Sequence, residues 1–315
     1  MSSSGGLAGV SAPPALRVIC GPTAAGKSGI AMALAERAGA TVVSADARQL
    51  YRGFDIGTAK PPRSDRGRVP HVGIDIADPV ERWSASRWAT SAAQWLDELA
   101  AAKRAAVVVG GTGFYVHALV TPLGTAPTLD GAARAALDAE LARLSFAELR
   151  RWCAALDPPR AHLGRTQLLR AIETALLTGT RLSDAHAASP RTVTRVPHYL
   201  VVDPGDDLPR RIEARVDAML AGGWADEVRA LLAHVPADAP AWNACGYGAM
   251  RELVLGERST AAVRQSVIVA TRQYAKRQRT WLRHQLGAAP VTRIDPGDPR
   301  HLEVAWAWWT GATTA

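Results

Sequence analysis

The sequence predicts an α/β fold, in which a parallel β-sheet carries helices on both faces and an all-helical domain is inserted. Two observations lead to this prediction. Short apolar runs alternate with segments of helical periodicity through residues 15–121 and again in residues 191–315. Residues 122–190 contain helical segments only, which breaks the alternation. In parallel sheets of this kind, ligands bind beyond the carboxyl ends of the strands.

Six apolar runs are predicted as buried strands, because each is short and bounded by glycine, proline or polar residues. In chain order they are Leu16–Gly21, Thr41–Asp46, His71–Ile76, Ala105–Gly110, His198–Asp203 and Val291–Asp295. Helices are predicted where apolar residues recur at helical spacing, as Trp88, Ala92 and Leu99 do. In chain order they are Ser28–Ala38, Ser84–Arg104, Gly131–Leu144, Ser145–Leu156, Arg160–Leu177, Leu208–Gly222, Ala225–His234 and Ser259–Gln285.

The ends and the cysteines of the chain indicate a cytoplasmic protein. Residues 1–14 are small and uncharged, lack the pattern of a signal peptide, and are expected to form a disordered tail. Three scattered cysteines match no metal-binding spacing, and their odd number argues against a disulfide framework. No stretch is long and apolar enough to span a membrane. A monomer without an obligate protein partner is expected.

A phosphate-binding loop joins the first predicted strand to the first helix. Residues 21–28 read Gly-Pro-Thr-Ala-Ala-Gly-Lys-Ser, which fills every fixed position of the G-x-x-x-x-G-K-[ST] motif. Gly21 and Gly26 permit backbone conformations in which successive N–H groups form an anion site. We expect Lys27 to reach the outer phosphate and Ser28 to bind Mg²⁺. The expected fold is therefore P-loop NTPase-like.

The ends of two other predicted strands limit which reactions the phosphate-binding loop could serve. Asp46 follows the second strand, so a carboxylate is expected in the same crevice as the phosphate-binding loop. The strand Ala105–Gly110 runs into a second glycine-rich turn, where an ordinary ATPase commonly has an aspartate that helps to hold Mg²⁺. The loop alone does not name the reaction, since kinases, ATPases and GTPases share it. The sequence shows no hydrolytic machinery after this strand.

The last long helix is predicted to have one apolar and one basic face. Between residues 264 and 283 there is no acidic residue, and the basic residues are Arg264, Arg272, Lys276, Arg277, Arg279 and Arg283. A solvated surface is the ordinary explanation of such a charge run. The absence of acids and the net charge of +8 instead favour a polyphosphate or nucleic-acid partner.

Seven segments together resemble the tRNA dimethylallyltransferase family, also called the tRNA isopentenyltransferases. The most specific are 44–61 (SADARQLYRGFDIGTAKP), 110–115 (GGTGFY) and 270–283 (ATRQYAKRQRTWLR). The others are 71–79, 166–179, 211–220 and 246–250. No zinc-finger cysteines follow the basic helix, so the bacterial type is expected. The chain departs from many relatives at Ala47, Val72-Gly73 and Gly248, and none of these departures removes a catalytic role.

The resemblance implies a reaction between dimethylallyl diphosphate and tRNA. The family transfers the five-carbon group to N6 of adenosine 37, next to the anticodon, and releases diphosphate. The phosphate-binding loop would then hold a diphosphate rather than ATP. The adenosine would leave its stack and enter a channel through the sheet domain, which the donor enters from the other side. The helical insertion would grip the anticodon stem-loop.

The resemblance also implies residue roles. Asp46 matches the general base that takes the N6 proton as the new bond forms. Thr112 matches a threonine near the bridging oxygen of the leaving diphosphate, and Arg215 matches a diphosphate-binding arginine. Cations around the leaving group should supply most of the catalysis. The diphosphate loop comprises Gly21, Pro22, Thr23, Ala24, Ala25, Gly26, Lys27 and Ser28, with Mg²⁺ on Ser28.

Contacts with tRNA are implied for four groups of residues. They are Asp46, Ala47, Arg48 and Gln49; Thr166, Gln167, Leu168, Leu169 and Arg170; Gly246 and Tyr247; and, on the basic face, Arg272, Lys276, Arg279 and Arg283.

Several alternatives stay open at this point. Asp46 could cap a strand end, Thr112 could be a turn residue and Arg215 could be a surface helix residue. A small-molecule kinase could use the same loop, but it would not need the basic helix. An adenylate prenyltransferase would lack residues 270–283, and a nucleotide-switched RNA-binding module would tolerate loss of Asp46.

Overall fold

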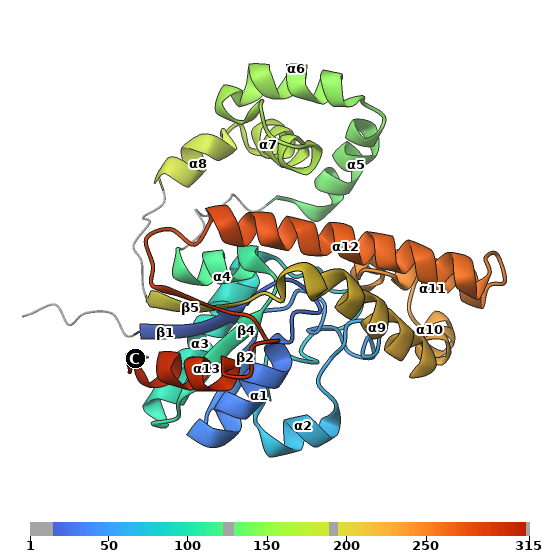
Figure 1. Cartoon of the computed structure of the whole chain (residues 1–315). Coiled ribbons are helices and arrows are strands. Elements are labelled where there is room, and N and C mark those ends of the chain that lie inside the picture. The colour runs from blue at the N-terminus through green and yellow to red at the C-terminus, as the bar shows by residue number, and fades with distance from the viewer. Residues whose placement is uncertain (1–14, 122–128, 189–194, 313–315) are drawn as a thin grey trace, which may run out of the picture. The chain divides into compact units, whose positions relative to one another are not determined.

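The computed structural model describes residues 15–121, 129–188 and 195–312 (Figure 1). Its contacts divide the chain into two compact units, one formed by Met1–Val120 with Thr194–Ala315 and the other by Thr121–Val193. The second unit nearly coincides with the insertion expected at residues 122–190. The tail expected at residues 1–14 lies outside the described residues.

The larger unit is built on a parallel sheet with the strand order β3-β2-β4-β1-β5-β6, which confirms the predicted fold class. The strands are β1 (Ala15–Cys20), β2 (Thr41–Ser44), β3 (His71–Val72), β4 (Ala106–Gly110), β5 (Val196–Val202) and β6 (Val291–Ile294). Cys20 pairs in register with Gly110 on one side and with Val201 on the other. The loops that follow β1, β2, β4 and β5 therefore leave the sheet at one edge.

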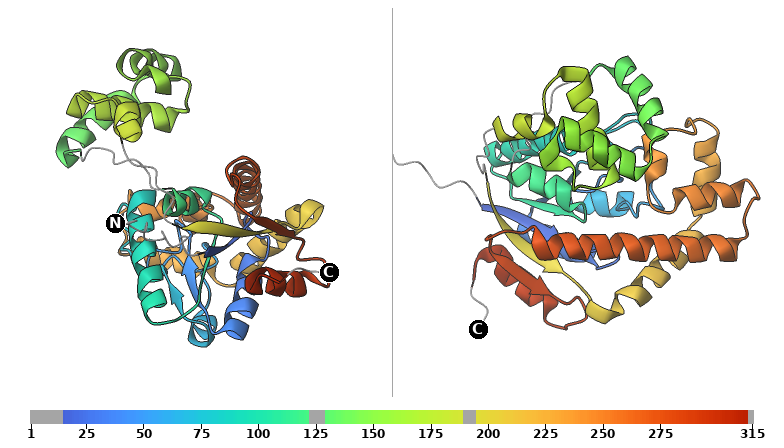
Figure 2. Two further views of the ribbon diagram at one scale, coloured as in Figure 1. Left: turned by 90° about the vertical axis from the view of Figure 1, so that its left-hand side faces the viewer. Right: turned by 90° about the horizontal axis from the view of Figure 1, so that it is seen from above.

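Helices cover both faces of this sheet. The core of one face joins the inward side chains of the strands to α1 (Lys27–Ala38) and α13 (His301–Thr310). On the other face, α3 (Ala85–Ala101) packs on α4 (Gly113–Val120), and the Trp88 indole of α3 stacks on Tyr115 and donates to the Ser44 carbonyl of β2. The long helix α12 (Thr260–His284) crosses this unit (Figure 2) and packs on α9 (Leu208–Ala221).

The smaller unit is helical, as expected. It contains α5 (Gly131–Ala142), α6 (Phe146–Leu156), α7 (Arg165–Thr178) and α8 (Leu182–Ala188). Its core comprises Leu141, Leu149, Cys153, Leu168, Ala171 and Ile172. The helix predicted from Arg160 begins later, because Pro158–Arg160 form a 3-10 turn and Gly164 precedes the first turn of α7.

Within the part of the chain that the structure describes, five helices have no counterpart in the prediction: α2 (Arg63–Arg68), α4, α8, α11 (Tyr247–Val254) and α13. All are short or begin at a glycine-rich turn, where local periodicity carries little signal. The helix Ala225–His234 is observed as α10 (Trp224–Leu232). Within the described ranges, none of the helices has the length and apolarity needed to cross a membrane.

Candidate active site at the carboxyl edge of the sheet

A cavity of about 1100 Å³ opens at the carboxyl edge of the sheet. It is bounded by the phosphate-binding loop, the ends of β2 and β4, and side chains of α9 and α12. Among the residues that line it are Thr23, Lys27, Ser28, Asp46, Gly111, Arg215, Tyr274 and Gln278. Segments that lie more than 250 positions apart in the sequence, such as Thr23 and Gln278, thus meet around one space.

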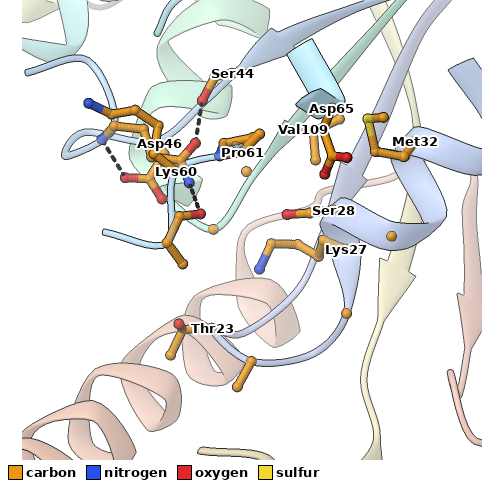
Figure 3. A pocket seen from close by; sticks show the side chains of 18 of the residues that line it. Thr23, Lys27, Ser28, Met32, Ser44, Asp46, Lys60, Pro61, Asp65 and Val109 are labelled. Carbon is orange, nitrogen blue, oxygen red and sulfur yellow. Dashed lines mark hydrogen bonds between the residues drawn. The ribbon is translucent and has the colours of Figure 1, made fainter. Parts of the chain in front are cut away.

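The phosphate-binding loop occupies the turn between β1 and α1, as predicted. Gly21 has no room for a side chain, because a Cβ atom there would lie 2.2 Å from the Val202 carbonyl oxygen. Gly26 has φ 94°, a conformation that favours glycine, and Ala24 adopts φ 63° without being a glycine. Figure 3 shows Lys27 and Ser28 pointing from the start of α1 into the cavity, across from Asp46.

Two cations of the cavity lack a carboxylate partner. Lys27 Nζ donates to the Pro22 carbonyl at 2.7 Å, and neither Lys27 nor Arg215 forms an ion pair with any described residue. Burial, and then the Arg215 charge, lower the pKa of the Lys27 ammonium to about 8, although Asp46 opposes the change. Burial also lowers the pKa of Arg215. Such uncompensated positive charge is the environment that a diphosphate requires.

Asp46 is both a cap and a candidate base. Its Oδ1 accepts hydrogen bonds from the N–H groups of Arg48 (2.8 Å) and Gln49 (3.4 Å), so the strand-end cap that we considered is present. Its Oδ2 makes no hydrogen bond among the described residues. The cap fixes one oxygen and orients the carboxylate, which leaves the second oxygen for a substrate proton.

Thr112 and Tyr274 lie close to this carboxylate. The Thr112 hydroxyl accepts a hydrogen bond from the Ala47 N–H at 3.2 Å and thereby ties the turn after β4 to the end of β2. Burial and the Asp46 charge raise the pKa of the Tyr274 phenol to about 12, and the nearby Thr112 hydroxyl opposes this rise. Tyr274 also lines the cavity, a role that the sequence did not predict.

Two further residues of the site, Gln278 and Arg211, were not predicted. Gln278 of α12 accepts a hydrogen bond from the Thr23 N–H at 2.7 Å and donates to the Gly111 carbonyl at 2.9 Å. Arg211 of α9 lines the cavity, with its Nη1 3.4 Å from the position of a Cβ atom on Gly26. A possible signal for both was their place within segments 270–283 and 211–220, which carry the family resemblance.

Part of the predicted tRNA-binding set is buried. Leu168 is 0% exposed in the core of the helical unit, and Tyr247 is 0% exposed with its hydroxyl donating to Glu227 at 2.6 Å. Gly246 has φ 92° and packs on Trp224, where a Cβ atom would lie 2.4 Å from the ring. The side chains of Leu168 and Tyr247 are thus buried in the free protein, and tRNA contact by these two residues stays a prediction. Their motifs are apolar because they pack.

The other residues predicted to contact tRNA differ in their exposure and in the hydrogen bonds that they already make. Gln49 is held by Ser44 and by the Thr58 and Ala59 carbonyls, and Arg48 donates to the Pro240 carbonyl at 3.4 Å. In the helical unit, Thr166 and Gln167 are exposed, Leu169 and Arg170 are half-buried, and the Gln167 side chain caps α7 through the Gly164 N–H. RNA contact by these residues stays a prediction.

The basic face of α12 is more compensated than the sequence suggested. Although the segment has no acids, neighbouring elements supply them: Arg264 pairs with Asp217 at 2.6 Å, Arg272 with Glu213, and Arg279 with Asp203. Lys276 and Arg283 are exposed and form no ion pair with a described residue. Residues 264–283 contain no acidic residue, but acidic residues of neighbouring elements pair with three of their arginines.

Comparison with known proteins identifies the family. The family models of IPP transferase and isopentenyl transferase match residues 49–285 and 14–69, respectively. A tRNA dimethylallyltransferase of Stenotrophomonas maltophilia is 40% identical over 296 residues, which cover 89% of this chain and 93% of the relative. One from Halorhodospira halophila is 42% identical over 286 residues, covering 88% and 92%.

Solved structures agree with this assignment. The tRNA isopentenylpyrophosphate transferase of Bacillus halodurans is 31% identical, with a TM-score of 0.66 and coverage of 95% of this chain and 96% of that one. A eukaryotic dimethylallyltransferase acting on tRNA shares the fold at 22% identity, with a TM-score of 0.76 and coverage of 94% and 77%. With its sequence matched over nearly its whole length and its fold reproduced, this chain belongs to the tRNA dimethylallyltransferase family.

Proposed function

We propose that this enzyme transfers the dimethylallyl group of dimethylallyl diphosphate to N6 of adenosine 37 in tRNA and releases diphosphate. Dimethylallyl transfer to tRNA is the activity named in its relatives. The observation that carries the finer proposal is the pairing, in one cavity, of two cations without carboxylate partners and a carboxylate with one unused oxygen.

The cations serve the leaving group. Lys27, Arg215 and the N–H groups of the phosphate-binding loop would hold the diphosphate, whose charge grows as its bond to the allylic carbon breaks. Because these groups are already fixed and partly desolvated, they stabilise the developing charge without reorganising. The end of β4 is a glycine, so the aspartate that helps to hold Mg²⁺ in an ordinary ATPase is absent at this position.

The carboxylate serves the acceptor. As N6 forms its bond to the allylic carbon, the carbon–oxygen bond to diphosphate breaks and N6 must lose one proton. The free oxygen of Asp46 would accept that proton, while the Arg48 and Gln49 N–H groups hold the other oxygen in place. Extrusion of the adenosine from its stack would bring N6 to this carboxylate.

Mg²⁺ fits the cavity as a partner of the diphosphate. The Ser28 hydroxyl points into the cavity beside Lys27 (Figure 3), and hydroxyl, phosphate and water oxygens are the ligands that Mg²⁺ prefers. Among the described residues there is no cluster of three metal-binding side chains, so the ion would depend on the diphosphate and water for most of its ligands. When bound, it would neutralise charge on the diphosphate.

The helical unit would hold the anticodon stem-loop, and the protein would act in the cytoplasm as a monomer. Exposed polar residues at the start of α7, among them Thr166 and Gln167, support the first part. The three cysteines are all free, which fits a reducing compartment.

The test combines purified protein, Mg²⁺, dimethylallyl diphosphate and an unmodified anticodon stem-loop with adenosine at position 37. Mass spectrometry of the RNA should show a gain of C5H8. The Asp46→Ala variant should lower kcat by about 10²–10⁴-fold, the range of general base catalysis. Phosphate transfer from ATP to a small acceptor, without a gain in RNA mass, would instead identify a kinase.

A further inference from the structure

We propose that Gln278 is a positioning residue that sets the phosphate-binding loop and the general base in one arrangement. The inference rests on the proposed function, since it concerns the same donor site. It assigns to α12 a role that its basic outer surface does not explain.

The Gln278 side chain connects two loops that are remote in the sequence. Its amide is buried, with 7% of the residue exposed, and uses both of its ends. Oε1 accepts from the Thr23 N–H at 2.7 Å, and Nε2 donates to the Gly111 carbonyl at 2.9 Å. An amide side chain can accept at one end and donate at the other without a net charge. A charged residue here would change the field on the diphosphate.

The contact with Thr23 supports a strained part of the loop. Ala24, the next residue, has φ 63°, which is unfavourable for a residue with a Cβ atom and persists only where the surroundings impose it. The bond from the Thr23 N–H to Gln278 is such a constraint, because it fixes the Pro22–Thr23 peptide, which directly precedes the strained region at Ala24. Without it, the loop can relax to conformations in which its N–H groups no longer converge on one anion.

The contact with Gly111 reaches the general base. Gly111 has no side chain because a Cβ atom there would lie 2.3 Å from Gln278 Nε2. The next residue, Thr112, accepts the Ala47 N–H at 3.2 Å, and Ala47 directly follows Asp46. Hydrogen bonds and short peptide segments thus connect Thr23, Gln278, Gly111, Thr112 and Asp46.

Neighbouring residues of α12 also contact the loops that Gln278 connects. Tyr274, one turn before Gln278, lines the cavity near Thr112 and Asp46. Trp281, one turn after it, packs on Gly113, where a Cβ atom would lie 2.2 Å from the ring. These three side chains lie at helical spacing, so one side of α12 contacts the site. Gln273 and Lys276 lie away from this side of the helix and are exposed.

The test measures binding of inorganic diphosphate with Mg²⁺ to the full chain by calorimetry, without tRNA. Gln278→Met keeps the shape and removes both hydrogen bonds. We expect its dissociation constant to rise roughly tenfold, as for the loss of about one net hydrogen bond. In turnover, KM for dimethylallyl diphosphate should rise and kcat should fall, while KM for the stem-loop stays the same. Gln273→Met, on the exposed side of the same helix, is the matched control and should match wild type in diphosphate binding.

A second variant keeps the test valid if Gln278→Met does not fold. Gly111→Ala leaves Gln278 in the chain but pushes its amide off the Gly111 carbonyl, and it should weaken diphosphate binding in the same direction. Binding by folded Gln278→Met equal to wild type would overturn the inference alone, as would unchanged binding by Gly111→Ala. Wild-type protein that binds no diphosphate would overturn the proposed function as well.

Discussion

Two groups of basic residues in this protein differ in their surroundings. Lys27 and Arg215 line the cavity, lose part of their hydration and have no carboxylate partner among the described residues. Arg272, on the surface of α12, is exposed and pairs with Glu213. The first group has lowered pKa values because burial disfavours its charge. The charge of the second group is hydrated and paired with a carboxylate, so it needs no ligand.

The difference teaches which cations identify a site. A desolvated cation without a counter-ion destabilises the folded protein, so its presence indicates a ligand that supplies the missing charge. An exposed ion pair contributes little to stability and indicates little about function. By this criterion, the cavity is the stronger evidence for an anionic substrate, although the α12 surface has more charges.

The largest effect that this comparison predicts is at Arg215. Arg215→Ala should lower kcat/KM for dimethylallyl diphosphate by about 10²–10³-fold, the cost of removing one preorganised group from a developing charge. Steady-state kinetics with saturating stem-loop would measure it. Arg264→Ala is the control, because Arg264 is exposed and paired with Asp217, and its effect on the same constant should be small. Equal losses in both variants would remove the distinction between the two groups.

An intermediate effect is expected from the pH dependence of diphosphate binding. The Lys27 ammonium has a pKa of about 8 in the free protein, lowered from 10.5, so it is charged below that pH and neutral above it. Raising the pH from 7 to 9 should therefore weaken binding roughly tenfold, since about nine-tenths of Lys27 is then neutral. The measurement is the ratio of wild-type to Lys27→Arg affinity at each pH, in which the ionisation of diphosphate itself cancels.

Arginine stays charged throughout this range, so the ratio reports Lys27 alone. A ratio that does not change between pH 7 and 9 would contradict the lowered pKa. Lys27 would then be charged in the free protein at both pH values, as the ion-paired arginines on the surface of α12 are.

The sequence predicted the sheet and the phosphate-binding loop because their signals are local. The loop needs Gly21 and Gly26 at fixed spacing, and the strands are continuous apolar runs. Residues that act across the fold carry no such signal. In the sequence, Gln278 is one polar residue in a polar helix, and only the fold brings Thr23 and Gly111 to its side chain. The burial of Tyr247 likewise depends on residues remote in the sequence. Spatial neighbours, rather than sequence neighbours, decide these roles.

The smallest effect predicted is on tRNA binding by the α12 surface. It tests whether unpaired and ion-paired cations on that surface differ in their contribution to binding. Lys276 is exposed and forms no ion pair with a described residue, so we expect it to release one counterion when it meets an RNA phosphate. Lys276→Ala should weaken stem-loop binding a few-fold. It should also reduce the magnitude of the negative slope of log association constant against log salt concentration by about 0.7–0.9. Fluorescence anisotropy over a salt series would measure both.

The matched variant removes a compensated charge. Arg272→Ala combined with Glu213→Ala leaves the net charge unchanged, and because the two side chains already neutralise each other, both affinity and salt slope should stay near wild type. A loss as large as that of Lys276→Ala would show that Arg272 leaves Glu213 to bind RNA. Ion pairing in the free protein would then not indicate which surface cations contact tRNA. The absence of a carboxylate partner would identify ligand-binding cations only where the cations are buried.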